Sequence, residues 1–197
     1  MCGPDGSNDA GSDSDDRPSA VAIERPSVAI VDAVVDLWVA LAAGQRAYDS
    51  HILPEANRDV VRETLAQRAV TGELRVAMAG GDVVGFVTFG LERGSYEQDA
   101  TRGVVRNLYV RPAHRGHGVG SDLLAAAEAA LEDAGATVVA LEAMAGNDRA
   151  REFYRERGYT AHRVQFEKST GVASRGATKQ GSGTRPPDEN DTHSKED

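Results

Sequence analysis

Cysteine, long apolar runs and metal-binding clusters are all scarce in this chain of 197 residues. The single cysteine, Cys2, excludes a disulfide framework and a cysteine-based metal site, and the five histidines are too scattered to indicate one. No apolar run approaches the ~20 residues that span a bilayer, and Cys2 has no signal-peptide apolar segment beside it. We therefore expect a soluble, cytoplasmic protein that needs neither a metal nor a membrane.

Lysine is also rare, because Lys168, Lys179 and Lys195 are the only lysines among 22 basic residues. The 31 acidic residues give a net charge of −9, which disfavours nonspecific binding to nucleic acid or anionic lipid. Excess acid with little lysine resembles the proteins of salt-in halophiles, whose carboxylate-rich surfaces keep them soluble in concentrated salt. GC-rich codon usage is the alternative source of this bias. We expect a halophilic archaeal origin.

Composition divides the chain into a central domain and two tails. Residues 1–20 and 169–197 are rich in Gly, Ser, Asp and Pro and lack periodicity, so they cannot bury enough apolar surface to fold. We predict a disordered acidic N-terminal tail, one folded domain over 21–168, and a disordered C-terminal tail.

Within the domain, strand and helix patterns alternate and predict a mixed α/β sheet in the order β-α-α-β-β-β-α-β-α-β. The strand from 103 to 110 leads through a helix to a parallel strand, which forms a right-handed crossover. The predicted strands are 21–26, the two arms of a hairpin around Gly80-Gly81-Asp82, 103–110, 137–144 and 159–168. The predicted helices are 27–44, 55–70, 118–133 and 147–157.

A glycine-rich loop, "RGHGVG" at 115–120, joins a predicted strand to the long helix that follows. Glycine lets backbone N–H groups approach a ligand closely, and a helix N-terminus attracts anions, so the loop favours a pyrophosphate site. A tight turn that needs glycine only for its geometry is the alternative. The spacing matches neither the Walker motif nor Gly-x-Gly-x-x-Gly.

The segment "LYVRPAHRGHGVGSDLL" resembles the acyl-CoA-binding motif of the GCN5-related N-acetyltransferases (GNAT), Arg/Gln-x-x-Gly-x-Gly/Ala. Arg115, Gly118 and Gly120 occupy its defining positions. A second segment, "LEAMAGNDRAREFYRERGYT" at 141–160, resembles the family's next block of Asn, Ala, Phe-Tyr and Gly-Tyr. Both motifs occur in the family's order, so the resemblance implies the GNAT fold with splayed central strands.

The resemblance also implies how acetyl-CoA binds. The strand at 103–110 would splay at a bulge, and N–H groups near Leu108 and Val110 would hold the pantetheine arm and polarise the thioester carbonyl. Asn147, the expected helix N-cap, matches a position that often touches CoA. The CoA pyrophosphate would bind the N–H groups of Arg115, Gly116, His117, Gly118, Val119 and Gly120.

The same resemblance assigns proton transfer. Tyr154 matches the general acid that protonates the departing CoA sulfur, with a core tyrosine as the alternative. Glu142 matches a proposed base in the branch that acetylates protein N-termini, although a water-mediated base or substrate orientation is equally consistent. In the loop from 45 to 55, Tyr48, Asp49 and His51 could contact the acceptor amine, or be ordinary polar surface residues.

The sequence thus predicts an N-acetyltransferase that moves an acetyl group from acetyl-CoA to a primary amine by direct attack in a ternary complex. The domain lacks a cysteine for a ping-pong route. The acceptor is either a small-molecule amine or a protein N-terminus, and homodimers are common in the family. The rival function is a noncatalytic acyl-CoA-binding sensor or interaction domain.

Overall fold

The computed structural model describes residues 21–92, 94 and 97–171. The predicted tail 1–20 and most of the predicted tail 169–197 lie outside the described residues. The chain divides into two units, one that ends at Tyr159 and one that begins at Thr160. All helices and strands described below belong to the first unit.

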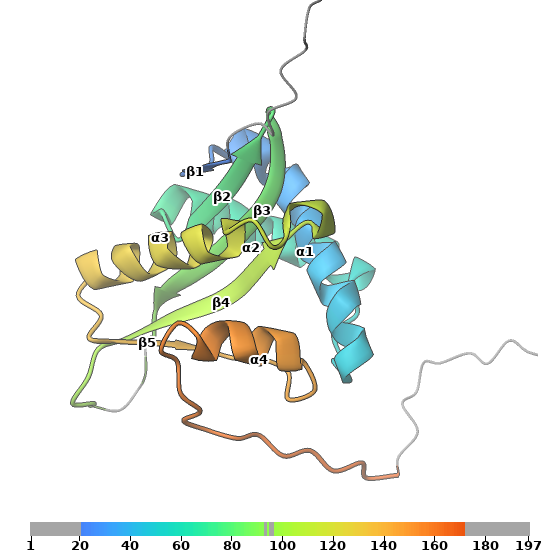
Figure 1. The fold of residues 1–197 in the computed structure, drawn as a ribbon. Coiled ribbons are helices and arrows are strands. Elements are labelled where there is room, and N and C mark those ends of the chain that lie inside the picture. The colour runs from blue at the N-terminus through green and yellow to red at the C-terminus, as the bar shows by residue number, and fades with distance from the viewer. Residues whose placement is uncertain (1–20, 93, 95–96, 172–197) are drawn as a thin grey trace, which may run out of the picture. The chain divides into compact units, whose positions relative to one another are not determined.

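The first unit is a mixed sheet of five strands with four α-helices, which confirms the predicted mixed α/β class with one strand fewer than expected (Figure 1). The strand order is β1-β2-β3-β4-β5, and every neighbouring pair is antiparallel except β4 and β5, which are parallel. Short 3-10 turns precede α1, α2 and α3. The elements are β1 (Ala22–Glu24), α1 (Val31–Gln45), α2 (Arg58–Thr71), β2 (Leu74–Ala79), β3 (Asp82–Leu91), β4 (Arg102–Val110), α3 (Val119–Asp133), β5 (Val138–Leu141) and α4 (Asp148–Arg155).

The strand predicted over 159–168 is the one element that the structure contradicts. Residues 159–168 have no regular secondary structure, and the Val164 and Phe166 side chains are 70% and 90% exposed. Their alternation is a local pattern, whereas a strand also needs a neighbour that satisfies its backbone N–H and C=O groups. The observed order therefore ends at α4.

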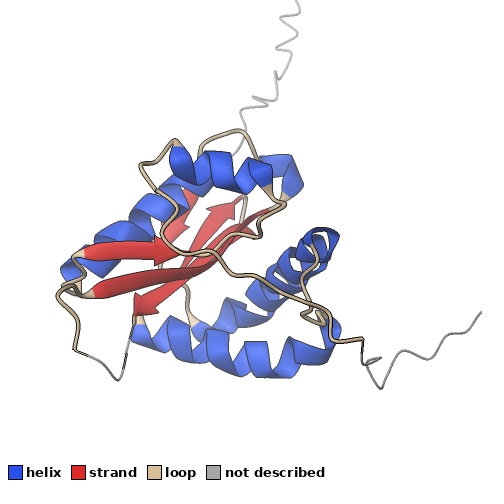
Figure 2. Ribbon diagram, turned by 90° about the horizontal axis from the view of Figure 1, so that it is seen from below, coloured by secondary structure: helices blue, strands red, loops and turns tan. Residues whose placement is uncertain are grey.

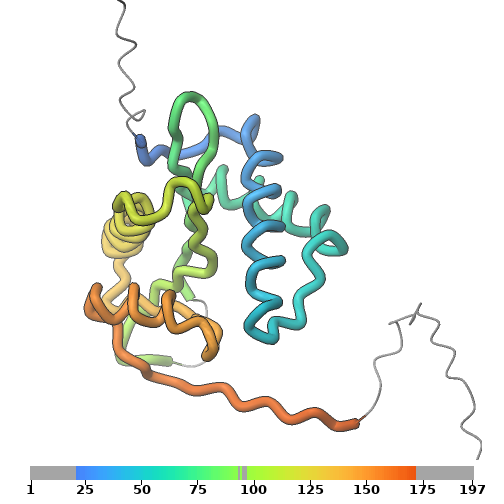
Figure 3. The backbone as a smooth tube through the Cα atoms, turned by 45° about the vertical axis from the view of Figure 1, so that its right-hand side comes forward, coloured from blue at the N-terminus to red at the C-terminus, as the bar shows by residue number. Residues whose placement is uncertain are grey.

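Helices cover both faces of the sheet (Figures 2 and 3). Successive residues of β3 point to opposite faces, so Phe86 packs with α1 and α2 while Val87 packs with α3. Each face has its own aliphatic core, in agreement with the low aromatic content. The sheet is thus the middle layer of three, with α3 on one face and α1 and α2 on the other.

The helical segment Val28–Tyr48 is long and apolar enough to cross a membrane, with a mean hydropathy of 1.7. This corrects the expectation that no segment reaches that length. In the fold, Val34 and Val35 are fully buried in the core. Asp32 and Asp36, which interrupt the apolar run, form ion pairs of 2.9 and 2.7 Å with arginines of α2. The segment therefore packs as a core helix of this unit.

The pairing of β4 changes at Arg106. Opposite β3, Thr88 pairs with Asn107 and Phe89 with Val105, so Arg106 is an additional, bulged residue. On the other side, β5 pairs with β4 only from Arg102 to Val105. Beyond the bulge, β3 is the one strand among the described residues that pairs with β4. The predicted splay of the central strands is confirmed.

Candidate active site

Beyond the bulge, the open edge of β4 exposes main-chain hydrogen-bonding groups. The Arg111 N–H donates to the Val84 carbonyl of β3 at 2.8 Å. Because N–H directions alternate along a strand, the N–H groups of Leu108 and Val110 point away from β3. The Val110 carbonyl accepts from Arg115 Nε at 2.8 Å. The N–H groups of Leu108 and Val110 lie along the part of the β4 edge with which β5 does not pair.

The glycine loop lies directly after this edge. Gly116 and Gly118 have φ values of 81° and 86°, in the left-handed region that glycine adopts without steric cost. The first backbone hydrogen bonds of α3 run from the N–H groups of Ser121 and Asp122 to the Gly118 carbonyl. The N–H groups of Val119 and Gly120 precede these bonds and lie at the positive end of the helix dipole. This loop can therefore bind an anion through its backbone.

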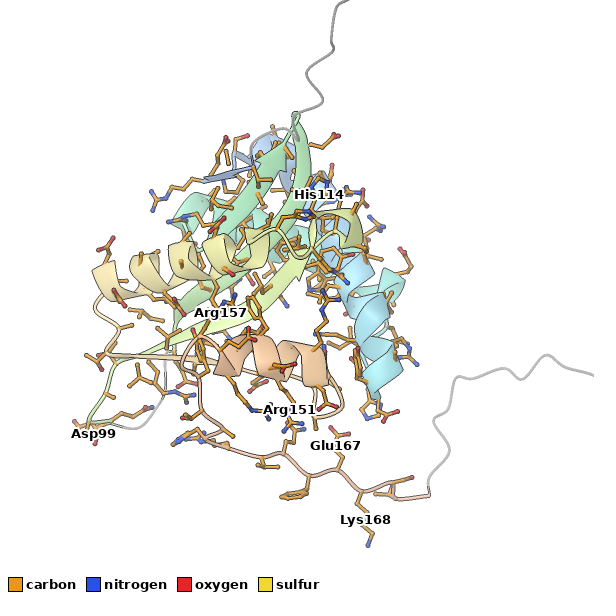
Figure 4. The ribbon with its side chains drawn as sticks, viewed as in Figure 1. Asp99, His114, Arg151, Arg157, Glu167 and Lys168 are labelled. Atoms are coloured by element: carbon orange, nitrogen blue, oxygen red, sulfur yellow. The ribbon has the colours of Figure 1, made fainter. Side chains whose placement is uncertain are left out.

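The arginines beside the loop have structural bonds of their own. Arg115 Nε holds the end of β4, and its guanidinium lies 5.4 Å from the centre of the Tyr109 ring. Arg111 Nε donates to the Val83 carbonyl at 2.9 Å. His114 and His117 flank the glycines, and Figure 4 shows His114 at the loop before α3. The two arginine side chains fix the loop to the sheet at its base.

Glu142 and Tyr154, both predicted from the sequence, line one small pocket beside the bulge. The pocket has α1 on one side of the sheet and α4 on the other, with β4 between them. Its lining comprises Leu41, Gln45, Val105, Arg106, Asn107, Leu108, Glu142 and Tyr154. The structure therefore brings a carboxylate and a phenol to the point where the sheet opens.

The Tyr154 side chain comes from α4 and packs edge-on against two aromatic rings. The ring centres of Phe153 and Tyr159 lie 5.2 and 5.9 Å from it. Burial raises the pKa of Tyr154 above its ordinary value of 10.0, because the charged phenolate is poorly solvated there. The hydroxyl is therefore protonated throughout the neutral range. The Tyr159 hydroxyl instead donates to Glu128 Oε1 at 2.6 Å.

Glu142 immediately follows β5. Val139 and Leu141 pack against the α3 core, so alternation places Glu142 toward the opposite face, where it is exposed. Asn147 caps α4, because its Oδ1 accepts from the Ala150 N–H at 3.1 Å. The predicted capping role is thus observed, and it orients the helix that carries Tyr154.

The predicted acceptor residues Tyr48 and His51 are not among the eight described residues that line the pocket. Tyr48 lies nearby, since a Cβ added to Gly146 would be 3.6 Å from its Cδ1 atom. The loop after α1 therefore meets the loop between β5 and α4. His51 is exposed in the first of these loops.

Several residues around the pocket were not singled out from the sequence. Arg106 and Asn107 interrupt an otherwise apolar strand, and this polar pair was the available signal. Asn107 Oδ1 accepts from the buried Thr88 hydroxyl at 3.0 Å. Arg157, between α3 and α4 in Figure 4, stacks 3.6 Å from the Phe153 ring centre and donates to Ser121. Within the described part of the chain, no group of three or more His, Cys, Asp or Glu could hold a metal ion.

Residues 38–159 match the model of the acetyltransferase (GNAT) family. An aminoalkylphosphonate N-acetyltransferase of Salmonella typhimurium is 32% identical over 95 residues, which span 48% of this chain and 61% of that relative. A GCN5-related N-acetyltransferase from Ralstonia eutropha superposes with a TM-score of 0.62 at 22% identity, covering 77% of this chain and all of that one. An aminoglycoside N-acetyltransferase in complex with CoA gives 0.59 at 18% identity, covering 79% and 98%. This chain belongs to the GNAT family of acetyltransferases.

Proposed function

We propose that this acetyltransferase moves the acetyl group directly from acetyl-CoA to a primary amine in a ternary complex. The observation that carries the proposal is the pocket beside the bulge, which Glu142 and Tyr154 share with β4. At that point the N–H groups of Leu108 and Val110 lie along an open strand edge. A carboxylate, a phenol and the Leu108 segment of the strand edge line this one small volume, which supports roles as base, acid and oxyanion donor.

Acetyl-CoA would lie along the open edge of β4. Its pantetheine arm carries amide groups, which can pair with the free strand edge as another strand would. Its pyrophosphate would bind the loop glycines and the first N–H groups of α3. Asn147, which caps α4, would also contact the cosubstrate, as the family resemblance implies.

The reaction begins with an amine that must lose its proton before attack. An alkyl ammonium has a pKa of about 10.4 and an α-amine about 7.7–8.0, so a base helps either one. Glu142 accepts this proton, directly or through water. The nitrogen then adds to the thioester carbonyl, and the N–H of Leu108 or Val110 stabilises the oxyanion.

Collapse of the tetrahedral intermediate breaks the bond between carbon and sulfur. Tyr154 donates its proton to the thiolate, which leaves as free CoA. The nitrogen loses its second proton to the phenolate, directly or through water, so that a neutral amide and a protonated Tyr154 result. Because burial raises the pKa of Tyr154, the acid form persists as the pH rises and is lost only above about pH 10. Ionisation of Tyr154 should therefore not reduce activity between pH 7 and 9.

A small-molecule amine is the acceptor class that we favour over a protein N-terminus. The Salmonella relative is named for acetylation of an aminoalkylphosphonate, a small amine. The acid-rich, lysine-poor composition supports a halophilic, cytoplasmic setting, so turnover should be measured in molar KCl as well as in dilute buffer.

Free-thiol release from acetyl-CoA tests the proposal, with amino acids, polyamines, aminoglycosides and short peptides as acceptors. Acceptor-dependent release is expected. Tyr154→Phe should lower kcat by about 10- to 100-fold without changing the Kd for acetyl-CoA measured by calorimetry, because only the transferable proton is removed. Unchanged activity in Tyr154→Phe would assign the acid role elsewhere. Tight acetyl-CoA binding without any acceptor-dependent release would favour the sensor instead.

A further inference from the structure

The pocket contains one cation, Arg106, that acetyl transfer as described above does not use. Its side chain is exposed, and it lines the pocket together with Glu142. Among the residues that the structure describes, no carboxylate forms an ion pair with Arg106. Arginine that is otherwise unpaired in a binding pocket commonly recognises a carboxylate or a phosphate group, often through two parallel hydrogen bonds.

The bulge determines where this cation points. Asn107 faces the α1 and α2 side of the sheet, because its side chain bonds with Thr88 there. Arg106 is the additional residue beside it and lines the pocket with Leu41 of α1. A bulge commonly redirects a side chain in this way next to an active site. Arg106 therefore faces the helical layer opposite α3 and its glycine loop.

The surroundings of Arg106 do not neutralise its charge. Arg68 of α2 is near enough that Arg106 contributes to lowering its pKa, although burial is the larger cause. Arg68 is itself fixed by Glu73 at 3.1 Å and by the Phe89 carbonyl at 2.8 Å. Glu73 is thus already engaged by Arg68. A positively charged neighbour makes an external anion more favourable at Arg106.

The cosubstrate does not supply that anion. The pantetheine arm and the thioester are uncharged, and the phosphates of acetyl-CoA belong to the glycine loop at 116–120. That loop follows the far end of the open edge, whereas Arg106 begins it. Glu142 in the same pocket is already assigned to the amine, so the acceptor is the remaining source of an anion for Arg106.

We propose that Arg106 is an anion-binding, specificity-determining residue of the acceptor site, and that the acceptor is an amine that also carries a carboxylate, phosphonate or phosphate group. The inference rests on the proposed function, because the amine must reach Glu142 in the same pocket. Glu142 and Arg106 then match the two ends of a zwitterion. A purely cationic polyamine would bring a second ammonium group toward Arg106.

The test compares acceptors of similar length and different charge: 2-aminoethylphosphonate and β-alanine, ethanolamine, and ethylenediamine. The wild-type kcat/KM should be at least about 10-fold higher for the anionic pair than for ethanolamine. Arg106→Gln should lower kcat/KM for the anionic pair by about 10- to 100-fold, mainly through KM, and should lower it much less for ethanolamine. Arg106→Lys should retain part of the preference, and Arg106→Glu should shift it toward ethylenediamine.

Arg102→Gln is the matched control, since it removes the same charge from the same strand outside the pocket and breaks only the 3.0 Å ion pair with Glu92. It should leave the acceptor preference intact. A wild-type preference for ethylenediamine, or an equal loss for all acceptors in Arg106→Gln, would overturn the inference.

The absence of acceptor-dependent thiol release would be a failure of the proposed function rather than of the anion site alone. Calorimetry with 2-aminoethylphosphonate on the CoA-bound protein then decides the inference. Saturable binding that weakens at least about 10-fold in Arg106→Gln would support it. Equal binding in both proteins, or none in either, would overturn it.

Discussion

The two halves of β4 belong to one strand but have different surroundings. From Arg102 to Val105 the strand lies between β3 and β5, and its main chain pairs on both sides. From Arg106 to Val110, β3 is its one partner within the described part of the chain. The first half is ordinary sheet interior, and the second half is the open edge that leads to the glycine loop.

Residue type does not account for the difference, since both halves contain valine and other strand-forming residues. Two features of the neighbours do account for it: β5 ends at Leu141, and the bulge breaks the register opposite Phe89. A binding edge can therefore arise inside a sheet without a change in the character of the strand. The predictions that follow test whether the open half has a role that the paired half does not.

The largest expected effect is at the end of the open half, where Gly118→Glu should weaken CoA binding by at least about 1,000-fold. A carboxylate at this position would occupy and repel the phosphate site, and like-charge contacts cost several kcal/mol. Calorimetry with CoA measures the change.

Gly81→Glu is the control for this variant, because Gly81 also has a positive φ, 89°, but lies in the turn between β2 and β3. It should bind CoA normally. Equal CoA affinity in Gly118→Glu and Gly81→Glu would contradict the assignment of the glycine loop.

A smaller effect is expected within the open half from Leu108→Pro, which removes an N–H that faces away from β3. We expect about a 100- to 1,000-fold lower kcat, as for loss of one oxyanion donor. Leu108→Ala keeps the N–H and controls for the lost side chain.

Tyr109→Pro removes an N–H that faces β3. It should destabilise the fold more than Leu108→Pro, because a backbone hydrogen bond between β4 and β3 is lost.

Thermal unfolding of these three variants, together with their thiol-release rates, separates the two kinds of N–H. If Leu108→Pro and Leu108→Ala were equally active, the open edge would not stabilise the oxyanion through this group.

The smallest expected effect concerns the helix that carries Tyr154. Asn147→Ala should lower the free energy of unfolding by about 1 kcal/mol, because the Ala150 N–H loses its cap. Asn147→Asp keeps a capping oxygen and should be nearly as stable as the wild type. Urea unfolding measures both variants. A cosubstrate contact would show as a rise in the Kd for acetyl-CoA in Asn147→Asp, where capping alone predicts none.

The sequence predicted most of the sheet because its elements are specified locally. Helix periodicity, the hairpin turn at Gly80-Gly81 and the glycine loop each depend on neighbouring residues, and all of these elements are observed. Gly72 ends α2 in the left-handed conformation, as a C-terminal glycine does. Gly44 was expected to end the first helix, but α1 continues through it to Gln45.

What the sequence could not predict depends on partners distant in the chain. Val164 and Phe166 alternate as a strand would, yet no neighbouring strand pairs with them in the described residues. Arg106 and Asn107 look like an ordinary polar interruption until the register with β3 makes one of them a bulge. The motif resemblance found Tyr154 and Glu142, whereas only the fold places Arg106 beside them.

The bulge also sets the phase of the strand. Val105 and Leu108 face the same core although they are three positions apart, because Arg106 is one step out of the two-residue repeat. Deletion of that single residue would restore an uninterrupted repeat, with Leu108 and Val110 still on the same face as Val105, and would remove the bulge. The opening in this sheet is thus encoded by one additional residue in β4. An in-frame deletion of one codon would remove it more completely than most substitutions.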